Sequence, residues 1–189
     1  MPHEATANSG TLITVDLSPA TELADFQISS PTAEDAAEIH ALIASCPPLD
    51  QNSLYANLIQ CTHFARHCAV ARSEGRVVGW ISGHLPPQNR DTYFLWQVAV
   101  HPDMRGKALA RHMLASILSR PEQSGIKRIE TSITRSNEAS WALFRSLSGW
   151  LKAPMHSAPW FDRERHLAGQ HASEHLVTIG PITAPSSAG

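Results

Sequence analysis

Several features that are scarce or missing in the sequence narrow what the protein can be. No apolar run approaches the ~20 residues that a membrane-spanning helix requires. The N-terminus has neither a basic segment nor a continuous apolar one, so no secretory signal is expected. Cys46, Cys61 and Cys68 are an odd number of cysteines without CxxC spacing, which favours reduced thiols over a disulfide framework. These features predict a cytoplasmic protein without a membrane partner.

The sequence also lacks an excess of basic residues. Its 15 Lys and Arg and 17 Asp and Glu give a formal net charge of −2 at pH 7. Domains that bind nucleic acids usually carry a basic face, so no nucleic-acid partner is expected. With 189 residues, of which 42% are hydrophobic, the chain has the size and composition of one globular domain with a buried core.

The pattern along the chain indicates one domain between two flexible ends. Residues 1–24 and 183–189 lack sustained periodicity, so both are predicted to be flexible, and the domain is expected at 25–182. Strands are predicted at 26–29, 68–71, 77–81, 93–100, 127–133 and 176–179, and helices at 32–46, 53–64, 107–119 and 137–147. This order predicts a mixed α/β fold, with a mostly antiparallel central sheet flanked by helices.

The stretch HPDMRGKALARH, at 101–112, has the layout of an anion-binding loop. It follows the apolar strand FLWQVAV and opens a helix, whose first amides lack internal partners and carry partial positive charge. Arg105 and Lys107 add formal charge, and Gly106 lets the backbone bend close to a ligand. The alternative interpretation is a strand-to-helix turn with a solvated basic pair. The Walker and dinucleotide glycine patterns are absent, so neither a nucleoside triphosphate nor NAD is expected.

This loop resembles that of the GNAT superfamily of N-acetyltransferases, where an Arg/Gln-x-x-Gly-x-Gly/Ala segment after the fourth strand holds the pyrophosphate of acetyl-CoA. Arg105 and Ala110 match the outer positions. The resemblance implies a GNAT-like fold, acetyl-CoA as co-substrate, and a cofactor site that includes Arg105, Gly106, Lys107, Ala108, Leu109 and Ala110. Ala108 stands where the family usually has Gly. It offers the same amide if its φ is negative, and its methyl group is expected to weaken CoA binding or displace the phosphates.

A later stretch, NEASWALF at 137–144, resembles the second CoA-contacting segment of the superfamily. There an Asn and an aromatic residue seven positions later flank the pantetheine arm, which assigns Asn137 and Phe144 to the cofactor site. Many members have Tyr at the second position, as a proton donor to the departing thiolate. Phe144 has no such proton, so its expected role is packing against the cofactor.

Further segments make the resemblance more specific. CPPLDQNSLY at 46–55, HF at 63–64 and WQVAV at 96–100 resemble the diaminobutyrate acetyltransferases of ectoine biosynthesis. The similarity continues through HASEH at 171–175 and IGP at 179–181, in a consistent order. It implies transfer of acetyl from acetyl-CoA to the γ-amine of L-2,4-diaminobutyrate, a small diamino acid. The product is the precursor that a separate synthase cyclises to ectoine.

This reaction places demands on the side chains. An alkylammonium group is only about 1 part in 10³ neutral at pH 7, which costs roughly 4–5 kcal/mol before the amine can attack a thioester. A carboxylate can bind the cation, and a carboxylate or a His can accept its proton directly or through water. The developing oxyanion needs N–H donors, which a splayed strand with free amides at Val98 and Val100 would supply at the cofactor. No acyl-enzyme is required, so no reactive cysteine is expected.

The residues expected to bind the diamino acid are Asp50, Asn52, Tyr55, Trp96 and Glu174. The resemblance makes Glu174 the principal carboxylate for the γ-amine and the candidate acceptor of its proton, although composition alone favours a solvated charge at the start of a strand. Asp50 has an equal alternative as the N-cap of the next helix. The alternative interpretation of Tyr55 is a helix residue with a half-buried ring. The alternative interpretation of Trp96 is a core residue of a strand, although the face of its ring suits a cationic amine.

Other functional classes remain as alternatives. His171 and His175 have i, i+4 spacing, but without a further fixed pattern of ligands no metal site is expected. A GNAT enzyme for a protein amine or another small-molecule amine is the second hypothesis. A CoA-binding module without catalysis is the third, which Ala108 and Phe144 would suit. Superfamily members often pair through their sheets, so the resemblance leaves a homodimer open.

Overall fold

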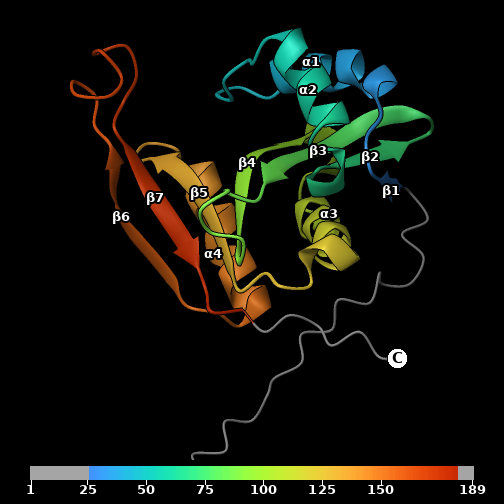
Figure 1. Cartoon of the computed structure of the whole chain (residues 1–189). Helices are drawn as coiled ribbons and strands as arrows, with labels where there is room; N and C mark the ends of the chain where they lie inside the picture. Colours follow the sequence, from blue (N-terminus) through green and yellow to red (C-terminus); the bar gives the residue numbers. More distant parts are fainter. Residues whose placement is uncertain (1–25, 183–189) are drawn as a thin grey trace, which may run out of the picture.

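The computed structural model describes residues 26–182, which form a seven-stranded sheet with helices on both faces (Figure 1). The flexible ends predicted at 1–24 and 183–189 lie outside the described residues. The strands are β1 Gln27–Ser29, β2 Ala69–Ser73, β3 Arg76–His84, β4 Thr92–Val100, β5 Arg128–Thr134, β6 Met155–Phe161 and β7 Glu174–Ile179. The helices are α1 Ala36–Ala44, α2 Leu54–Thr62, α3 Leu109–Leu118 and α4 Glu138–Leu151. Short 3-10 turns are η1 Ala33–Asp35, η2 Ala65–His67, η3 Pro102–Met104 and η4 Pro121–Gln123.

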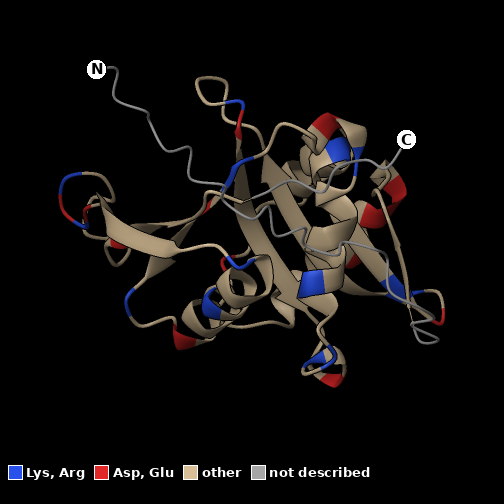
Figure 2. Cartoon of the chain, turned by 90° about the horizontal axis from the view of Figure 1, so that it is seen from below, with Lys and Arg blue, Asp and Glu red and all other residues tan. Residues whose placement is uncertain are grey.

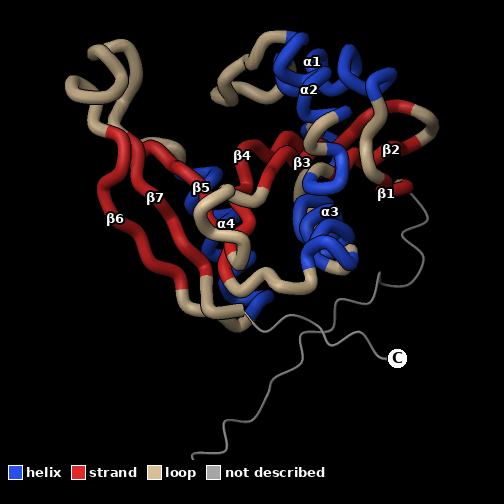
Figure 3. The backbone as a smooth tube through the Cα atoms, in the orientation of Figure 1, coloured by secondary structure: helices blue, strands red, loops and turns tan. Residues whose placement is uncertain are grey.

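The sheet has the order β1-β2-β3-β4-β5-β7-β6 and consists of two antiparallel halves. β1 to β4 pair antiparallel in chain order, and β5 and β6 each pair antiparallel with β7. The halves meet in the parallel pair β4–β5, whose ladder joins only residues 92–94 to residues 128–130. Beyond this ladder the two strands lean apart (Figure 3). The predicted mixed, mostly antiparallel sheet is confirmed.

The first half contains the predicted hairpin between β2 and β3. Ser73 pairs with Arg76 across a two-residue turn formed by Glu74 and Gly75. Both turn residues have positive φ, +50° at Glu74 and +79° at Gly75. This backbone geometry matches the right-handed twist of the flanking strands, which is why it recurs in tight hairpins.

Helices cover both faces of the first half (Figure 1). Ile39 of α1 and Trp80 of β3 belong to one buried cluster, and α3 contributes Leu109 and Met113 to a second cluster on the other face. A Cβ atom at Gly79 of β3 would meet side-chain atoms of both α3 residues at 3.0 Å. Glycine at this position therefore lets α3 lie close against the sheet.

The second half shares the α3 side of the core. Phe144 and Leu147 of α4 lie in the same buried cluster as the α3 residues, together with Val177 and Ile179 of β7. One continuous core thus runs under α3 and α4. The opposite face of the sheet is the one that α1 and α2 cover over the first half.

The sequence analysis predicts no helix or strand between residues 147 and 176, and this is wrong, because β6 lies there. Its sequence, MHSAPWF, is mostly exposed and contains Pro159. An edge strand needs few apolar residues, and it tolerates proline because one of its sides has no ladder to complete. α4 also runs four residues beyond its predicted end at 147, to Leu151.

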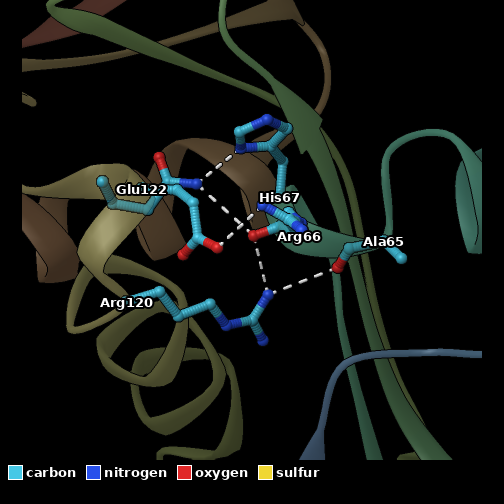
Figure 4. Close-up of polar contacts among 6 residues, drawn as sticks. Ala65, Arg66, His67, Arg120 and Glu122 are labelled. Atoms are coloured by element: carbon cyan, nitrogen blue, oxygen red, sulfur yellow. Dashed lines mark hydrogen bonds and ion pairs between the residues drawn. The ribbon is translucent and has the colours of Figure 1, made fainter.

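A polar network ties the connection between α2 and β2 to the end of α3 (Figure 4). Arg120 Nη1 donates to the carbonyl oxygens of Arg66 and Cys68, at 2.9 and 2.8 Å. Gln123 Nε2 lies 2.5 Å from His67 Nδ1. Burial lowers the pKa of His67, so its ring is neutral at pH 7 and Nδ1 can accept the amide N–H. These contacts fix the entry to β2 against the helix that carries the anion-binding loop.

Charged residues of both signs are interspersed over the molecule rather than gathered on one side (Figure 2). This distribution accompanies the small net charge of −2. Among residues 26–182, no helix combines the length and the hydropathy that crossing a membrane requires.

Candidate active site

The divergence of β4 and β5 frees backbone amides of β4. His101 N donates to the carbonyl oxygen of Val78 at 2.9 Å, which makes these two residues a hydrogen-bonded pair of the β3–β4 ladder. Such pairs alternate along an antiparallel ladder. Val98 and Val100 lie between the hydrogen-bonded positions, so their amides point away from β3, toward the side on which β5 no longer pairs. This geometry agrees with the free amides predicted at these two residues.

The loop between β4 and α3 presents a concave row of amides. Gly106 and Ala108 have φ values of +77° and +56°, and Lys107 between them does not have a positive φ. Left-handed residues on both sides of a residue with negative φ bend the loop sharply, and successive backbone N–H groups in such bends can form a nest that suits an anion. The first helical bond of α3 runs from His112 N to the Ala108 carbonyl oxygen, at 3.1 Å. Within residues 26–182, the amides of residues 106–111 have no protein acceptor.

Ala108 corrects one expectation of the sequence analysis. The expected amide required a negative φ, whereas Ala108 has φ +56° and ψ +21°, in the left-handed region. This conformation costs a residue other than glycine on the order of 1–2 kcal/mol. Ala108 thus adopts a backbone suited to Gly, the usual family residue. It also leaves the helical region, so α3 begins at Leu109 rather than at the predicted position 107.

The side chains around the nest divide into two groups. Arg105 and Lys107 are exposed, so their charges are available beside the free amides. Leu109 and Ala110 point into the core, and they can offer only their backbone N–H groups to a ligand. The structure therefore brings the predicted loop residues together as one concentrated positive site. The first amides of any helix lack internal partners, so the role of this loop as the cofactor site stays a prediction.

The second predicted cofactor segment opens α4. Asn137 is the N-cap, and its Oδ1 accepts the amide N–H of Ser140 at 3.0 Å. Phe144 is 3% exposed and packs in the core cluster under α3 and α4. Both residues therefore have a clear structural role, and their contact with a cofactor stays a prediction.

β4 contains a bulge at Trp96. Leu95 and Gln97 pair with consecutive residues of β3, so Trp96 between them has no partner. Leu95 and Val98 both pack on the α3 core cluster, although an odd interval would place them on opposite faces of a regular strand. Trp96 and Gln97 consequently both face the side of α1 and α2. The side chain of Trp96 is 50% exposed, so its interpretation as a core residue is wrong.

Gln97 connects β4 to the segment between α1 and α2. Its Nε2 donates to the Asp50 carbonyl oxygen at 2.9 Å, and its Oε1 accepts from Asn52 Nδ2 at 3.4 Å. Ser53 Oγ accepts the Ala56 N–H at 3.1 Å, so Ser53 is the N-cap of α2. The capping interpretation of Asp50 is therefore wrong, and its carboxylate is exposed beside β4. Two segments that carry the resemblance are thus in direct contact.

The large hydrophobic residues that are exposed within the described part of the chain border this region. They are Leu54, Tyr55, Trp96 and Trp160, with exposed fractions of 44%, 71%, 50% and 37%. The half-buried ring expected for Tyr55 is therefore wrong. These residues belong to the start of α2, to β4 and to β6, and the connection before α2 extends toward the β7–β6 arm (Figure 1). A gathering of exposed apolar side chains often marks a binding site.

Glu174 is the first residue of β7, and it is partly buried. It pairs with Thr134 of β5 and with Phe161 of β6. Val177 lies in the core cluster, and side chains alternate along a strand, so Glu174 faces the opposite side. Glu174 and Trp96 therefore lie on the same face of the sheet.

The histidines near Glu174 do not form the pair that their spacing allows. His175 lies on the core side of β7, where its ring centroid is 6.4 Å from that of Trp141 and its Nε2 accepts from Arg135 Nε at 3.4 Å. His171 lies in the β6–β7 connection, so the two histidines share no helix face. Within residues 26–182, no group of three or more His, Cys, Asp or Glu side chains is placed to hold a metal ion.

The sequence analysis misses two residues of this face, His84 and Trp160. The ring of His84 on β3 lies 5.4 Å from that of Phe94 and 6.2 Å from that of Trp96. Burial lowers the pKa of His84, so it is neutral at pH 7 and can accept a proton. Trp160 on β6 stacks on Phe161. The adjacent aromatic pair in the sequence is the signal that could have indicated this second residue.

The cysteines are packed inside the protein, where the Cys46 thiol donates to the Val100 carbonyl oxygen at 3.5 Å. Cys46, Cys61 and Cys68 are buried free thiols. Burial raises the pKa of Cys61 to about 11 and that of Cys68 to about 12, so both thiols stay protonated at neutral pH. This agrees with chemistry that needs no thiolate nucleophile.

The family of the chain is shown by comparison with known protein families. Residues 36–150 match the Acetyltransferase (GNAT) family. The chain belongs to this family. The GNAT-like fold expected from the loop sequence is confirmed, and the protein is an acetyltransferase.

Relatives of this GNAT enzyme with assigned names point to one acceptor. It is 49% identical to the L-2,4-diaminobutyric acid acetyltransferase of Methylotuvimicrobium alcaliphilum over 164 residues, which cover 87% of this chain and 95% of the relative. It is 46% identical to the enzyme of the same name from Halomonas elongata over 156 residues, which cover 82% of this chain and 81% of the relative. The specific resemblance inferred from the PPLD and WQV segments is confirmed.

Solved structures show the same relationship. Diaminobutyrate acetyltransferase EctA from Paenibacillus lautus, in complex with L-2,4-diaminobutyric acid and coenzyme A, matches with a TM-score of 0.78 and 32% identity, covering 83% of this chain and 95% of that chain. The ribosomal-protein-S18-alanine N-acetyltransferase from Escherichia coli matches with a TM-score of 0.60 at 17% identity, covering 86% and 97%. The second similarity shows the shared fold alone.

Proposed function

We propose that this GNAT enzyme transfers the acetyl group of acetyl-CoA to the γ-amine of L-2,4-diaminobutyrate, giving N4-acetyl-2,4-diaminobutyrate for ectoine biosynthesis. The observation that carries the proposal is the similarity to EctA of Paenibacillus lautus, whose structure holds both that diamino acid and coenzyme A. The relatives from Methylotuvimicrobium alcaliphilum and Halomonas elongata, which bear the same name, support the choice of acceptor.

The nest before α3 suits the pyrophosphate of acetyl-CoA, which supplies the thioester. The free amides of residues 106–111 offer hydrogen bonds, and Arg105 and Lys107 add charge beside them. The amides of Val98 and Val100 point into the opening between β4 and β5, where they would stabilise the negative charge that develops on the thioester oxygen. These residues would bind and orient the co-substrate without forming a covalent bond to it.

The face that carries Glu174 and Trp96 suits the diamino acid. A carboxylate attracts the ammonium group, and the face of an indole ring favours a cation beside it. Gln97 holds the segment with Asp50 and Asn52 next to this face. Tyr55 follows this segment at the start of α2, where its side chain is exposed. In this arrangement Glu174 binds the γ-amine and accepts its proton.

Release of free thiol from acetyl-CoA, measured with a panel of amines, tests the proposal. The panel contains L-2,4-diaminobutyrate, ornithine, lysine and a peptide with a free N-terminus. We expect diaminobutyrate to give the highest kcat/KM and the product to carry the acetyl group on the γ-nitrogen, as shown by NMR. Release with the peptide alone would support a protein acceptor instead. No release with any amine would support a CoA-binding module.

The Glu174→Gln variant tests the role of the carboxylate, because it keeps the shape and removes the charge. We expect kcat/KM for diaminobutyrate to fall on the order of 100-fold, the usual scale for loss of a proton acceptor. Glu122→Gln is the matched control, because Glu122 is an exposed partner of Arg66 at 3.3 Å and such pairs contribute little. An unchanged rate in Glu174→Gln would remove this residue from the mechanism.

The cellular setting follows from the reaction. We infer a cytoplasmic location, because the reaction consumes acetyl-CoA and its product passes to a further enzyme of the pathway. We also infer a homodimer, because β6 is an edge strand of the sheet and its outer backbone groups are open to pairing. Light scattering coupled to size-exclusion chromatography measures the mass in solution, and a monomer mass would reject the dimer.

A further inference from the structure

β6 contains a bulge that turns a tryptophan onto the face of Glu174. Pro159 pairs with His175 and Phe161 pairs with Glu174, so Trp160 has no partner on β7. The rings of Trp160 and Phe161 stack, with centroids 4.0 Å apart and an angle of 23° between their planes. The bulge therefore places two successive aromatic side chains on one face, whereas a regular strand would separate them.

This face is the one that carries the predicted substrate residues. Residues directly opposite each other in an antiparallel pair point to the same side, so Phe161 and its stacked neighbour Trp160 share the face of Glu174. The ring of Trp160 also lies 5.8 Å from that of Phe94 on β4. β5 and β7 separate β4 from β6 in the sheet. The indole of Trp160 consequently reaches over this face toward β4.

Two bulges thus act in the same way on the two halves of the sheet. The bulge of β4 exposes Trp96, and the bulge of β6 exposes Trp160, on the same face and with Glu174 on β7 between the two strands. The side chains of Trp96 and Trp160 are 50% and 37% exposed. In contrast, Trp80 on β3 is completely buried. Neither exposed indole is required to fill the core, so their placement needs another reason.

We propose that Trp160 is a specificity-determining residue that walls the ammonium site of Glu174 from the β6 side, opposite Trp96. This inference rests on the proposed function. A carboxylate beside aromatic ring faces attracts an alkylammonium group, because the ring quadrupole adds to the charge attraction and the rings exclude water. Rigid indole walls on two sides also limit the length of the diamine that fits between them.

The variants Trp160→Leu and Trp160→Phe test this role. Leu removes the ring face, and Phe keeps a smaller one. We expect Trp160→Leu to raise KM for diaminobutyrate about 10-fold, the scale of a lost cation–ring contact at a partly desolvated site. KM for acetyl-CoA should stay within about 2-fold, because the nest before α3 is untouched. Trp160→Phe should lie between the wild type and Trp160→Leu.

A second measurement addresses the length of the acceptor. We expect the preference for diaminobutyrate over ornithine, as a ratio of kcat/KM values, to fall in Trp160→Leu because one wall is lost. Trp150→Leu on α4 is the matched control, since Trp150 packs on the core side of the sheet. Thermal melting of each variant identifies loss of folding, which would lower the apparent kcat with every acceptor and leave the ratio of kcat/KM values between acceptors unchanged.

The outcomes separate this inference from the proposed function. If the wild type acetylates no diaminobutyrate, the proposed function fails. If the wild type does so and folded Trp160→Leu keeps both its KM for diaminobutyrate and its length preference, Trp160 is no part of the site and this inference fails. A changed oligomeric state with unchanged kinetics would likewise overturn it, because Trp160 would then belong to a contact between copies of the chain.

Discussion

α3 and α4 both begin beside positions assigned to the cofactor, yet a side chain caps the first turn of α4 and none caps that of α3. At α4, Asn137 Oδ1 accepts the N–H of Ser140 at 3.0 Å. At α3, Ala108 is the N-cap and offers no side-chain acceptor. Its left-handed backbone continues a run of amides, residues 106–111, that have no protein acceptor within residues 26–182.

The difference separates a structural helix start from one suited to a ligand. Asparagine at the N-cap stabilises α4 whether or not a cofactor is present. The start of α3 gives up that stabilisation and adds the strain of Ala108, so its amides remain available for a phosphate. Substitutions at the two N-caps should therefore affect different properties, co-substrate binding at α3 and stability at α4.

The largest effect is expected from Ala108→Asp. A carboxylate at the nest would repel the pyrophosphate of acetyl-CoA. Two like charges about 4 Å apart near a protein surface repel each other by about 3–4 kcal/mol. We expect KM for acetyl-CoA to rise on the order of 100-fold, measured by thiol release at saturating diaminobutyrate. Asn137→Asp is the matched comparison, because it places the same charge at the α4 N-cap, where the predicted neighbour is the uncharged pantetheine arm, so a smaller rise is expected. An equal rise in both variants would show that the two helix starts do not differ in function.

Removal of the basic side chains should have a smaller effect. We expect Lys107→Ala and Arg105→Ala each to raise KM for acetyl-CoA about 5- to 10-fold, because each loses one charge-assisted contact to phosphate. The effect should shrink as salt is added, since the side chains are exposed and their charges are screened. Arg76→Ala in the β2–β3 hairpin is the control. A salt-independent KM would contradict the electrostatic role.

Loss of the cap at α4 should change stability instead. Asn137→Ala removes the acceptor for Ser140 N, and such substitutions lower the free energy of unfolding by about 1 kcal/mol. Urea unfolding followed by circular dichroism measures the change. Asn137→Ser, which retains a capping oxygen, should recover most of it. If the alanine variant unfolds at the same urea concentration as the wild type, the cap contributes nothing.

The smallest effect is expected from Ala108→Gly. Glycine adopts φ +56° without strain, but it also has more freedom in the unfolded chain. The net gain in the free energy of unfolding should be up to about 1 kcal/mol. KM for acetyl-CoA should fall slightly, because the methyl group no longer limits the approach of the phosphates. Lower stability in this variant would contradict the strain assigned to Ala108.

The sequence predicts the elements that bury an apolar stripe or carry a turn signal. The β2–β3 hairpin is found as expected because Glu74 and Gly75 supply a short turn between two apolar runs. α3 shows its inward stripe clearly, and Leu109 and Met113 are both buried. Where a residue type follows directly from burial or from turn geometry, the pattern in the sequence is sufficient.

The sequence does not predict features that depend on register between strands. The bulges at Trp96 and Trp160 arise from how β4 and β6 pair with their neighbours, and a single strand carries no record of that pairing. β6 itself lacks an apolar period because it is an exposed edge. The resemblance to a family indicated Glu174 and Trp96, but their common face follows only from the sheet.

The brief ladder between β4 and β5 has a mechanical consequence. The ladder pairs residues 92–94 with residues 128–130, and just before it the Asp91 carbonyl oxygen accepts from Lys127 N and Arg128 N at 2.7 and 3.2 Å. Within residues 26–182 no β4–β5 pairing continues past residue 94, so the wedge between the diverging ends of the two strands is not closed by backbone pairing. A molecule bound in that wedge would contact both β4 and β5, and it would add contacts between the two halves of the sheet that the strands do not make themselves. The melting temperature of the protein should therefore rise as the concentration of acetyl-CoA is increased.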